Sequence, residues 1–253
     1  MDEDKSTVRA VDRALHILKC FTFEQKEMNL ADLCKVSGLP KTTVFRLLAS
    51  LEKNGFVVKD ERAQTYRLGM VLFQLGNIVS SSIELRKISL PVMEELAKKT
   101  RETININIVQ GQERVCIEKV DGSHDLREFI EVGRSLPLYK GASGKILLAY
   151  LPETMQKEIL KNAGDNLKEP AENVLKQLEI IRRNGYAVSQ NERVLGAAAV
   201  SAPILNYDGK LVAGLTISGA AVRFTKEKIN EFINLVVNGA KEISKNLGYK
   251  DRE

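Results

Sequence analysis

Near the start of the chain, apolar residues recur at helical spacing in three short segments. The first segment, residues 7–21, places Val11, Ala14, Leu15 and Leu18 on one face of a predicted helix. Two further helices follow, each with an apolar stripe of its own. We expect the three stripes to share one core, which predicts a small helical domain.

A sharp turn separates the second helix from the third. Asn29 can cap the second helix with its side-chain oxygen, and Leu30, Leu33 and Val36 then follow at helical spacing. Gly38 ends that helix, because glycine tolerates the left-handed backbone that a reversal needs. The segment therefore reads as helix, turn, helix.

The third helix has two chemically different faces. Val44, Leu47, Leu48 and Leu51 form its apolar stripe. Short hydroxyls and one guanidinium on the other side suit close approach to the DNA major groove. An ordinary helical hairpin with a solvated face is an equal alternative at this point. The residues expected to contact DNA are Lys41, Thr42, Thr43, Phe45, Arg46 and Ser50.

A predicted hairpin then favours DNA binding. The β-rich runs 56–58 and 65–68 enclose a polar loop, and a two-stranded wing after the helices is typical of the winged helix-turn-helix. Lys59 and Arg62 in this wing are expected to contact the DNA backbone. We predict a winged helix-turn-helix domain over residues 7–69.

A second apolar stripe runs through the connection that follows. Leu72, Leu75 and Val79 share one helical face, and Pro91 is expected at a break or a helix start. Such a segment is too hydrophobic for a free linker. It predicts packing on a second copy of the chain, or alternatively on its own chain.

From Thr103 the hydrophobic period changes from helical to alternating. Residues 103–110 place Ile104, Ile106 and Ile108 on one face, which predicts a half-buried strand. Asp208-Gly209 marks a hairpin turn later in the chain. Strands and helices together predict an α+β domain, an antiparallel sheet with helices packed on it. The other expected strands are 114–120, 126–132, 186–188, 197–205 and 210–218, and the helices are 141–151, 153–161, 172–184 and 225–247.

Composition is that of an ordinary globular protein. The 253 residues are 43% hydrophobic and 28% charged, and the net charge of +5 is too mild to demand nucleic acid by itself. No apolar run is long enough to span a bilayer, and the acidic start is not a secretory signal. The odd number of cysteines, three, predicts reduced thiols. We therefore expect a cytoplasmic protein without membrane contact.

Motifs for catalysis and metal binding are missing from the sequence. The Gly141–Lys145 segment lacks the glycine and the hydroxyl residue of a phosphate loop, because Tyr139 and Ile146 stand there. No serine lies in a nucleophile elbow, and only His16 and His124 offer an imidazole, both expected on the surface. We predict no catalytic residues, no metal site and no cofactor.

A small-molecule site is nevertheless expected in the second domain. Gly141-Ala142-Ser143 opens a helix whose free N–H groups and dipole suit a carboxylate. Thr216 and Ser218 are same-face hydroxyls on an apolar strand, so they need polar partners. A ligand, buried water and backbone groups are the alternatives for those partners.

Over nearly its whole length the chain resembles the IclR family of bacterial transcriptional regulators. Four ordered blocks carry the resemblance: Gly38-Leu-Pro-Lys-Thr-Thr-Val-Phe-Arg-Leu-Leu48 with Leu51-Glu-Lys-Asn-Gly-Phe56, Gly141-Ala-Ser-Gly-Lys-Ile-Leu-Leu-Ala149, Gly185-Tyr-Ala187, and residues 192–203 with Leu215-Thr-Ile-Ser-Gly219 and Arg223. It implies a linker helix at 70–84 and a GAF-like effector-binding domain at 85–250. It also implies homodimers or homotetramers that bind double-stranded DNA at palindromic operators and respond to small organic acids.

The resemblance further implies an effector site. Its positions fall on Leu126, Phe129, Gly141, Ala142, Ser189, Ala199, Thr216 and Ser218. Family members often have an acidic residue where this chain has Ser189, and some have cysteine at the position of Ala199. We expect a DNA-binding regulator that is controlled by an organic or sugar acid, and we favour a repressor over an activator. The alternative is an enzyme or carrier of small carboxylates whose N-terminal helices serve assembly only.

Overall fold

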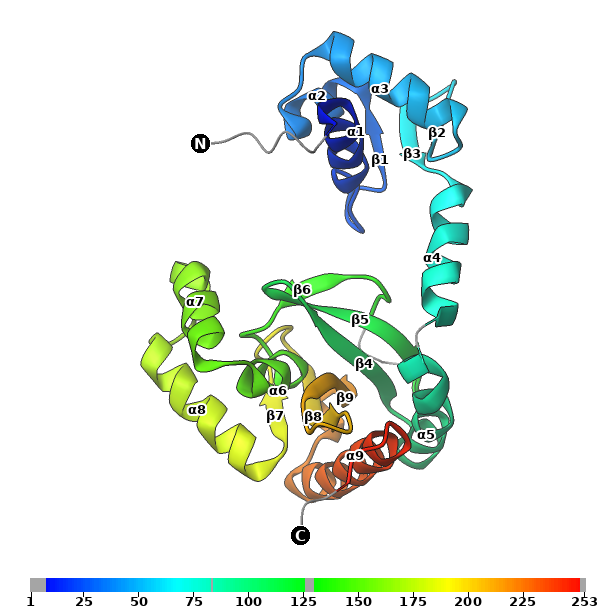
Figure 1. Cartoon of the computed structure of the whole chain (residues 1–253). Coiled ribbons are helices and arrows are strands. Elements are labelled where there is room, and N and C mark those ends of the chain that lie inside the picture. The colour runs from blue at the N-terminus through cyan, green and yellow to red at the C-terminus, as the bar shows by residue number, and fades with distance from the viewer. Residues whose placement is uncertain (1–7, 83, 126–129, 251–253) are drawn as a thin grey trace. The chain divides into compact units, whose positions relative to one another are not determined.

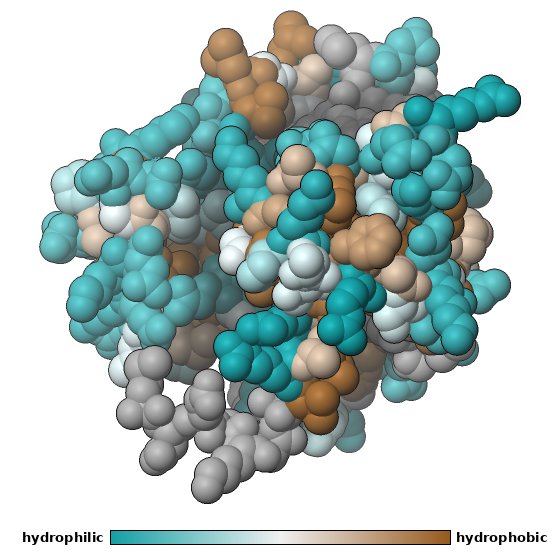
Figure 2. Space-filling view, turned by 90° about the horizontal axis from the view of Figure 1, so that it is seen from above, coloured by the Kyte–Doolittle hydropathy of each residue, from teal (hydrophilic) through white to brown (hydrophobic). Residues whose placement is uncertain are grey.

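The chain folds into two compact units, Met1–Ser82 and Ile83–Glu253, which are described separately here (Figure 1). The computed structural model describes residues 8–82, 84–125 and 130–250, with side chains from 8 to 76 and from 84 onwards in these ranges. No helix in the described part of the chain is long and apolar enough to cross a membrane. On the face drawn in Figure 2, hydrophobic residues form separate small groups among hydrophilic ones.

The first unit contains the predicted helices and wing, together with one strand that was not predicted. This strand, β1 (Glu27–Asn29), pairs with β3 (Thr65–Leu68) and buries Met28. The wing therefore belongs to a three-stranded antiparallel sheet in the order β1-β3-β2. The elements are α1 Arg9–Lys19, β1 Glu27–Asn29, α2 Leu30–Ser37, α3 Lys41–Lys53, β2 Val57–Asp60, β3 Thr65–Leu68 and α4 Met70–Ser82.

The predicted inward face of α1 is half right, because Ala14 and Leu18 pack on the core but Val11 and Leu15 do not. Val11 and Leu15 are 53% and 49% exposed, whereas Ile17 is fully buried in the core of the unit. Ala14, Ile17, Leu18 and Phe21 satisfy the same helical spacing as the predicted stripe. Packing selects this second stripe, which continues to Phe21 just beyond the helix, and leaves Val11 and Leu15 on the surface.

The turn between α2 and α3 forms as its residues predict. The Asn29 side chain accepts a hydrogen bond from Asp32 N at 2.9 Å, and Gly38 has the left-handed φ of 67°. Val36 is the exception, because it is 52% exposed and lies outside the core. The short helix buries only Leu33 completely, which is sufficient to hold it against α3.

A proline lies inside α5 (Glu84–Thr100), where a break or a helix start was expected. Pro91 removes one backbone hydrogen bond, yet the helix continues through it. Val92, Met93 and Leu96 follow it directly and are buried in the main core of the second unit. Packing of these residues in the core offsets the lost backbone hydrogen bond.

The second unit is an antiparallel sheet of six strands in the order β6-β5-β4-β9-β8-β7. Helices α5 and α9 pack on one face, and α6 with α7 and α8 lies on the other (Figure 1). The remaining elements are β4 Thr103–Gln110, β5 Glu113–Val120, β6 Ser135–Pro137, α6 Ala142–Tyr150, α7 Glu153–Ala163, α8 Ala171–Asn184, β7 Ala187–Gln190, β8 Ala197–Leu205, β9 Leu211–Ala220 and α9 Lys226–Asn246, with short 3-10 helices at Gly164–Asn166 and Ala221–Arg223. This is the predicted α+β class.

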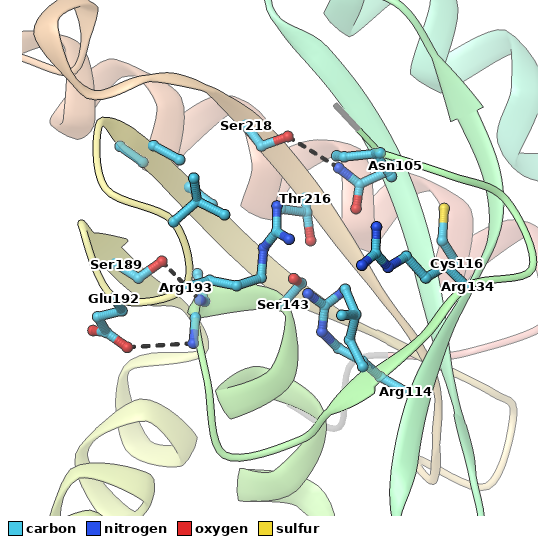
Figure 3. Close-up of a pocket in the computed structure, with 18 of the residues that line it drawn as sticks. Asn105, Arg114, Cys116, Arg134, Ser143, Ser189, Glu192, Arg193, Thr216 and Ser218 are labelled. Atoms are coloured by element: carbon cyan, nitrogen blue, oxygen red, sulfur yellow. Dashed lines mark hydrogen bonds between the residues drawn. The ribbon is translucent and has the colours of Figure 1, made fainter. Parts of the chain in front are cut away.

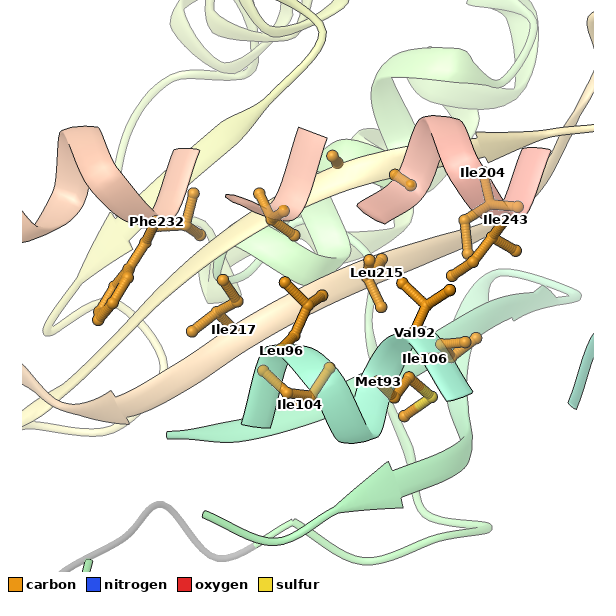
Figure 4. Close-up of a cluster of buried hydrophobic side chains, with 14 of the residues drawn as sticks. Val92, Met93, Leu96, Ile104, Ile106, Ile204, Leu215, Ile217, Phe232 and Ile243 are labelled. Atoms are coloured by element: carbon orange, nitrogen blue, oxygen red, sulfur yellow. The ribbon is translucent and has the colours of Figure 1, made fainter. Parts of the chain in front are cut away.

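The main core lies between the sheet and the α5–α9 pair (Figure 4). Ile104 and Ile106 of β4 and Leu215 and Ile217 of β9 meet Val92 and Leu96 of α5 there. β4 was predicted to be buried on this face only. However, Asn105 and Asn107 on its other face are also at most 1% exposed. Both faces of the central strands are therefore inside the protein.

One predicted strand does not form within the described residues. The expected strand 126–132 falls partly on residues 126–129, which lie outside the described ranges. Residues 130–132 are not in a strand, and the edge strand β6 begins later, at Ser135. β6 pairs with the first half of β5, from Glu113 to Val115.

A partly buried ion pair joins the residue before β4 to the 3-10 helix that follows β9. Arg223 donates two hydrogen bonds of 2.6 Å to the carboxylate of Glu102, which is 2% exposed. His124, expected on the open surface, is only partly exposed and places Nε2 3.9 Å from Glu102 Oε1. Gly219 makes room for the carboxylate, because a Cβ there would meet Glu102 Oε2 at 2.1 Å.

We predict that Gly219→Ala destabilises the second unit by about 3 kcal/mol, because the added methyl separates a buried charge from its partner. Urea denaturation followed by circular dichroism measures the change. Gly76→Ala is the control, since its methyl meets nothing within 4 Å in α4. Equal stability of the two variants would contradict the packing described for Gly219.

Candidate functional site

A small cavity, partly open to solvent, lies on the sheet face that α6 covers (Figure 3). Its floor comes from β4, β8 and β9, and the first residues of α6 form one end. The loop 191–196, between β7 and β8, contributes Glu192, Arg193 and Val194 to the wall. Arg114, Cys116 and Arg134 line the cavity on the side of β5.

Most of the predicted effector positions lie around this one cavity. Leu126 and Phe129 fall outside the described residues. The six others come from α6, β7, β8 and β9, which are far apart in the sequence. They are Gly141, Ala142, Ser189, Ala199, Thr216 and Ser218.

The N-terminus of α6 is already partly occupied by side chains of the chain itself. Gly141 N donates to Glu192 Oε2 at 3.3 Å, and Ala142 N donates to Ser189 Oγ at 2.8 Å. The expectation of free N–H groups is therefore wrong for both residues. Glu192 also pairs with the Lys145 ammonium at 2.8 Å, so its charge is balanced within the protein.

The cavity floor is a chain of buried polar groups. Asn107 Nδ2 donates to Asn105 Oδ1 at 2.6 Å, and Asn105 Nδ2 donates to Ser218 Oγ at 3.2 Å. Thr216 Oγ1 lies 2.8 Å from Ser201 Oγ. Side chains therefore supply the partners that Thr216 and Ser218 were expected to need. The residues that these hydroxyls bond were not predicted.

Several lining residues were missed because their sequence pattern suggested solvent. Asn105 and Asn107 occupy the polar positions of an alternating strand, where solvent is the usual neighbour. Arg114 is only 6% exposed, and its Nη1 donates to Asn107 Oδ1 at 2.5 Å. Arg193 and Glu192 lie in a loop. Charged residues are common in surface loops, so the sequence did not indicate that these two line a cavity.

Cys116 is the reactive side chain closest to this floor, but burial makes it inert. The thiol is 3% exposed, and desolvation raises the pKa of Cys116 to about 11. A folded-state pKa above the unfolded value of 9.0 favours the neutral thiol in the folded protein. Its contribution to stability is therefore fully present below pH 9 and is lost as the pH rises towards 11.

The predicted DNA-facing side of α3 lies on the surface of the first unit. Lys41, Thr42, Phe45, Arg46 and Ser50 are exposed, and Phe45 is 58% exposed. Thr43 is partly buried. Thr42, Thr43 and Arg46 line a shallow groove with Arg13 of α1, a cation that the sequence did not single out.

The two wing residues differ in their surroundings. Arg62 is exposed at the tip of the β2–β3 hairpin, where its backbone N–H donates to Asp60. Lys59 pairs with Glu61 at 2.8 Å, and this contact raises the pKa of Lys59. The ammonium of Lys59 has three N–H donors, so this pair uses only part of its capacity for hydrogen bonds.

Among the described residues no group of three or more His, Cys, Asp or Glu side chains could hold a metal ion. The polar groups that line the cavity are amides, hydroxyls, guanidinium groups and the carboxylates of Glu131 and Glu192. Such groups can orient a small molecule by hydrogen bonds.

Two family models match the chain, one to each unit. The model described as the IclR helix-turn-helix domain matches residues 10–61. The model described as the bacterial transcriptional regulator IclR C-terminal matches residues 78–245. The chain belongs to the IclR family of bacterial transcriptional regulators.

Individual members of the IclR family match over almost their whole length. The HTH-type transcriptional regulator KipR of Bacillus subtilis (strain 168) is 32% identical over 95% of this chain and 98% of its own. The HTH-type transcriptional repressor AllR of Salmonella typhi is 31% identical, covering 96% and 91%. An IclR homologue of Microbacterium hydrocarbonoxydans, crystallised with 4-hydroxybenzoate, has the same fold, with a TM-score of 0.80, 21% identity and coverage of 94% and 98%.

Membership in the IclR family decides between the two functional classes left open by the sequence. The chain is a DNA-binding transcriptional regulator and not an enzyme. Its N-terminal helices are the helix-turn-helix of the family, so a role in assembly alone is rejected.

We predict that Cys116 reacts slowly with iodoacetamide at pH 8, because only about one thiol in a thousand is ionised there. Mass spectrometry of the native protein gives the rate at each cysteine. The partly exposed Cys34 is the internal reference. Equal labelling of Cys116 and Cys34 at pH 8 would contradict the burial of the cavity floor.

Proposed function

We propose that this protein is a repressor whose binding to a palindromic operator is controlled by a small organic or sugar acid. Two features of the chain support this proposal. The second unit has a cavity lined by guanidinium groups and hydroxyls, and the predicted DNA-facing side of α3 is exposed on the first unit. The similarity to AllR, named a repressor, favours repression. We propose that the protein acts in the cytoplasm, because bacterial transcription takes place there.

For DNA binding, we propose that α3 enters the major groove. Arg46 and Thr42 lie on one exposed side of this helix and offer donors for base edges and phosphates. Lys41, Thr43, Phe45 and Ser50 border them, and Lys59 and Arg62 reach the backbone from the wing. The proposed domain limits are 7–69 for the DNA-binding domain, 70–84 for the linker helix and 85–250 for the effector domain.

For control, we propose that an acid binds in the cavity near Gly141, Ala142 and Ser189, over the floor of Thr216 and Ser218. Ala199, with its small methyl group, leaves space there, and Leu126 and Phe129 are the proposed apolar wall. The Microbacterium homologue supports a carboxylate ligand, because the molecule crystallised with it, 4-hydroxybenzoate, is an acid.

We also propose a homodimer or homotetramer. Val8, Val11 and Leu15 are exposed on one side of α1 and its N-terminal end. Met70 and Phe73 are exposed on α4. A second copy would cover these apolar side chains, and two copies related by a two-fold axis match a palindromic operator.

Arg46→Ala is expected to weaken operator binding by about 1–3 kcal/mol, if Arg46 bonds a guanine with both ends of its guanidinium. Fluorescence anisotropy with a labelled operator fragment measures the loss. Arg183→Ala, at an exposed position of α8 in the other unit, is the charge-matched control. Unchanged affinity in a folded Arg46→Ala protein would remove Arg46 from the interface.

The acid is expected to lower operator affinity and to raise the melting temperature of the wild-type protein, since a ligand of the folded state stabilises it. Gly141→Asp should abolish both effects, because a new carboxylate then lies at the proposed anion site. Gly141→Asn has the same shape and the same backbone strain at φ 75° without the charge, so it serves as the control. Retained effects in Gly141→Asp would place the acid elsewhere.

A further inference from the structure

A row of polar side chains crosses three strands of the cavity floor. Thr216 of β9 pairs in register with Asn105 of β4 on one side and with Ser201 of β8 on the other. Side chains in register point to the same face of a sheet. Ser201 is fully buried beside Thr216, whereas Asn105 and Thr216 line the cavity (Figure 3).

The hydrogen bonds fix the direction of the Thr216 hydroxyl. Ser201 Oγ donates its single proton to the Leu215 carbonyl at 2.9 Å. The 2.8 Å contact between Ser201 and Thr216 must therefore use the proton of Thr216. Thr216 is left with an unused lone pair and no proton for the cavity, so it acts there only as an acceptor.

Ser218 has the same polarity for a different reason. Its Oγ accepts from Asn105 Nδ2 at 3.2 Å, and its proton points to the Thr103 carbonyl at 3.5 Å. Asn105 Oδ1 is in turn occupied by Asn107 Nδ2. Both hydroxyls of the floor therefore lack a proton for a ligand, and they match a group that donates.

Other parts of the wall have the opposite polarity. Arg114, Arg134 and Arg193 line the cavity, and a guanidinium group can only donate hydrogen bonds. Figure 3 shows the three side chains around the same space as Thr216 and Ser218. The wall also contains the carboxylates of Glu131, which pairs with Arg134 at 3.0 Å, and of Glu192, which pairs with Lys145 at 2.8 Å. The three guanidinium groups outnumber these two carboxylates, so the cavity combines a net cationic wall with an accepting floor.

We infer that the effector is a hydroxy acid, whose hydroxyl donates to Thr216 while its carboxylate faces the guanidinium groups. This inference rests on the proposed function and narrows its ligand class. A keto acid of the same size has a carbonyl oxygen in place of the hydroxyl, and this oxygen can only accept hydrogen bonds. A deoxy acid has no polar group at that position. In both cases the remaining lone pair of the buried hydroxyl oxygen receives no donor from the ligand. Thr216 is the specificity-determining residue, and Ser201 positions its proton.

The first test compares matched pairs of acids by isothermal titration calorimetry. The pairs are lactate and pyruvate, 3-hydroxybutyrate and acetoacetate, and gluconate and 5-ketogluconate. We expect the hydroxy acid to bind at least about fivefold tighter than the keto acid in a pair that binds, as one hydrogen bond predicts. Equal or tighter binding of the keto acids, or no binding of any pair, would overturn the inference.

Two variants then separate the acceptor from its positioning residue. Thr216→Val removes the acceptor, so the preference for the hydroxy acid should fall by about fivefold to tenfold. Ser201→Ala leaves Thr216 in place but frees its proton, which should improve keto-acid binding and leave hydroxy-acid binding within about twofold. Thr216→Ser keeps the hydroxyl and should restore the preference if Thr216→Val is unstable.

Ser89→Ala is the matched control for Ser201→Ala. Ser89 is also a fully buried serine of this unit, but it lies in α5 outside the cavity. A change of preference in Ser89→Ala equal to that in Ser201→Ala would assign the effect to general destabilisation and overturn the role of Ser201.

Operator binding distinguishes this inference from the proposed function. If keto or deoxy acids release the operator as well as hydroxy acids do, the proposed control stands and the hydroxy-acid inference fails. If hydroxy acids bind with the expected preference and operator affinity does not change, the inference about the cavity stands and the proposed control fails.

Discussion

The architecture of the second unit depends on the central strands β4, β8 and β9 being buried on both faces. One face is apolar and joins α5 and α9 in the main core. The other carries amides and hydroxyls that have no bulk water to bond and must satisfy one another. The bonds from Arg114 through Asn107 and Asn105 to Ser218 meet this requirement, and the cavity is formed over them. The chemistry of the cavity floor therefore follows from these hydrogen-bonded polar groups as much as from the shape of the cavity.

Local features of the sequence predicted much of the fold. The Asn29 cap, the left-handed Gly38 and the alternating residues 103–110 act over a few residues, so their consequences are visible without the tertiary structure. α1 could not be oriented in this way, because two overlapping stripes have the same helical spacing and only packing on α2 and α3 selects Ile17. Pro91 was misread for the same reason, since the contacts that keep its helix intact come from elsewhere in the chain.

The sequence predicted many of the residues that surround the candidate site, but it did not predict the hydrogen bonds among them. The residues suggested by the family resemblance do surround one cavity, as far as the described residues extend. The sequence could not show that Glu192 and Ser189 accept hydrogen bonds from the N–H groups at the start of α6. The approach of Glu192 depends on the path of the loop 191–196, and that of Ser189 depends on where β7 lies beside α6. Nor could it show the direction of a proton on Thr216, which depends on Ser201 in the neighbouring strand and on the carbonyl of Leu215.

The dependence of Thr216 on Ser201 has a consequence for how such a regulator can diverge. Substitutions on the cavity face leave the apolar face of the same strands intact, so a new ligand preference need not disturb the main core. A change at position 216 or 201 alone, however, leaves a buried hydroxyl without its partner. The effect of either change therefore depends on which residue occupies the other position. Evolution towards a different ligand would proceed more easily by paired substitutions on β8 and β9 than by single ones.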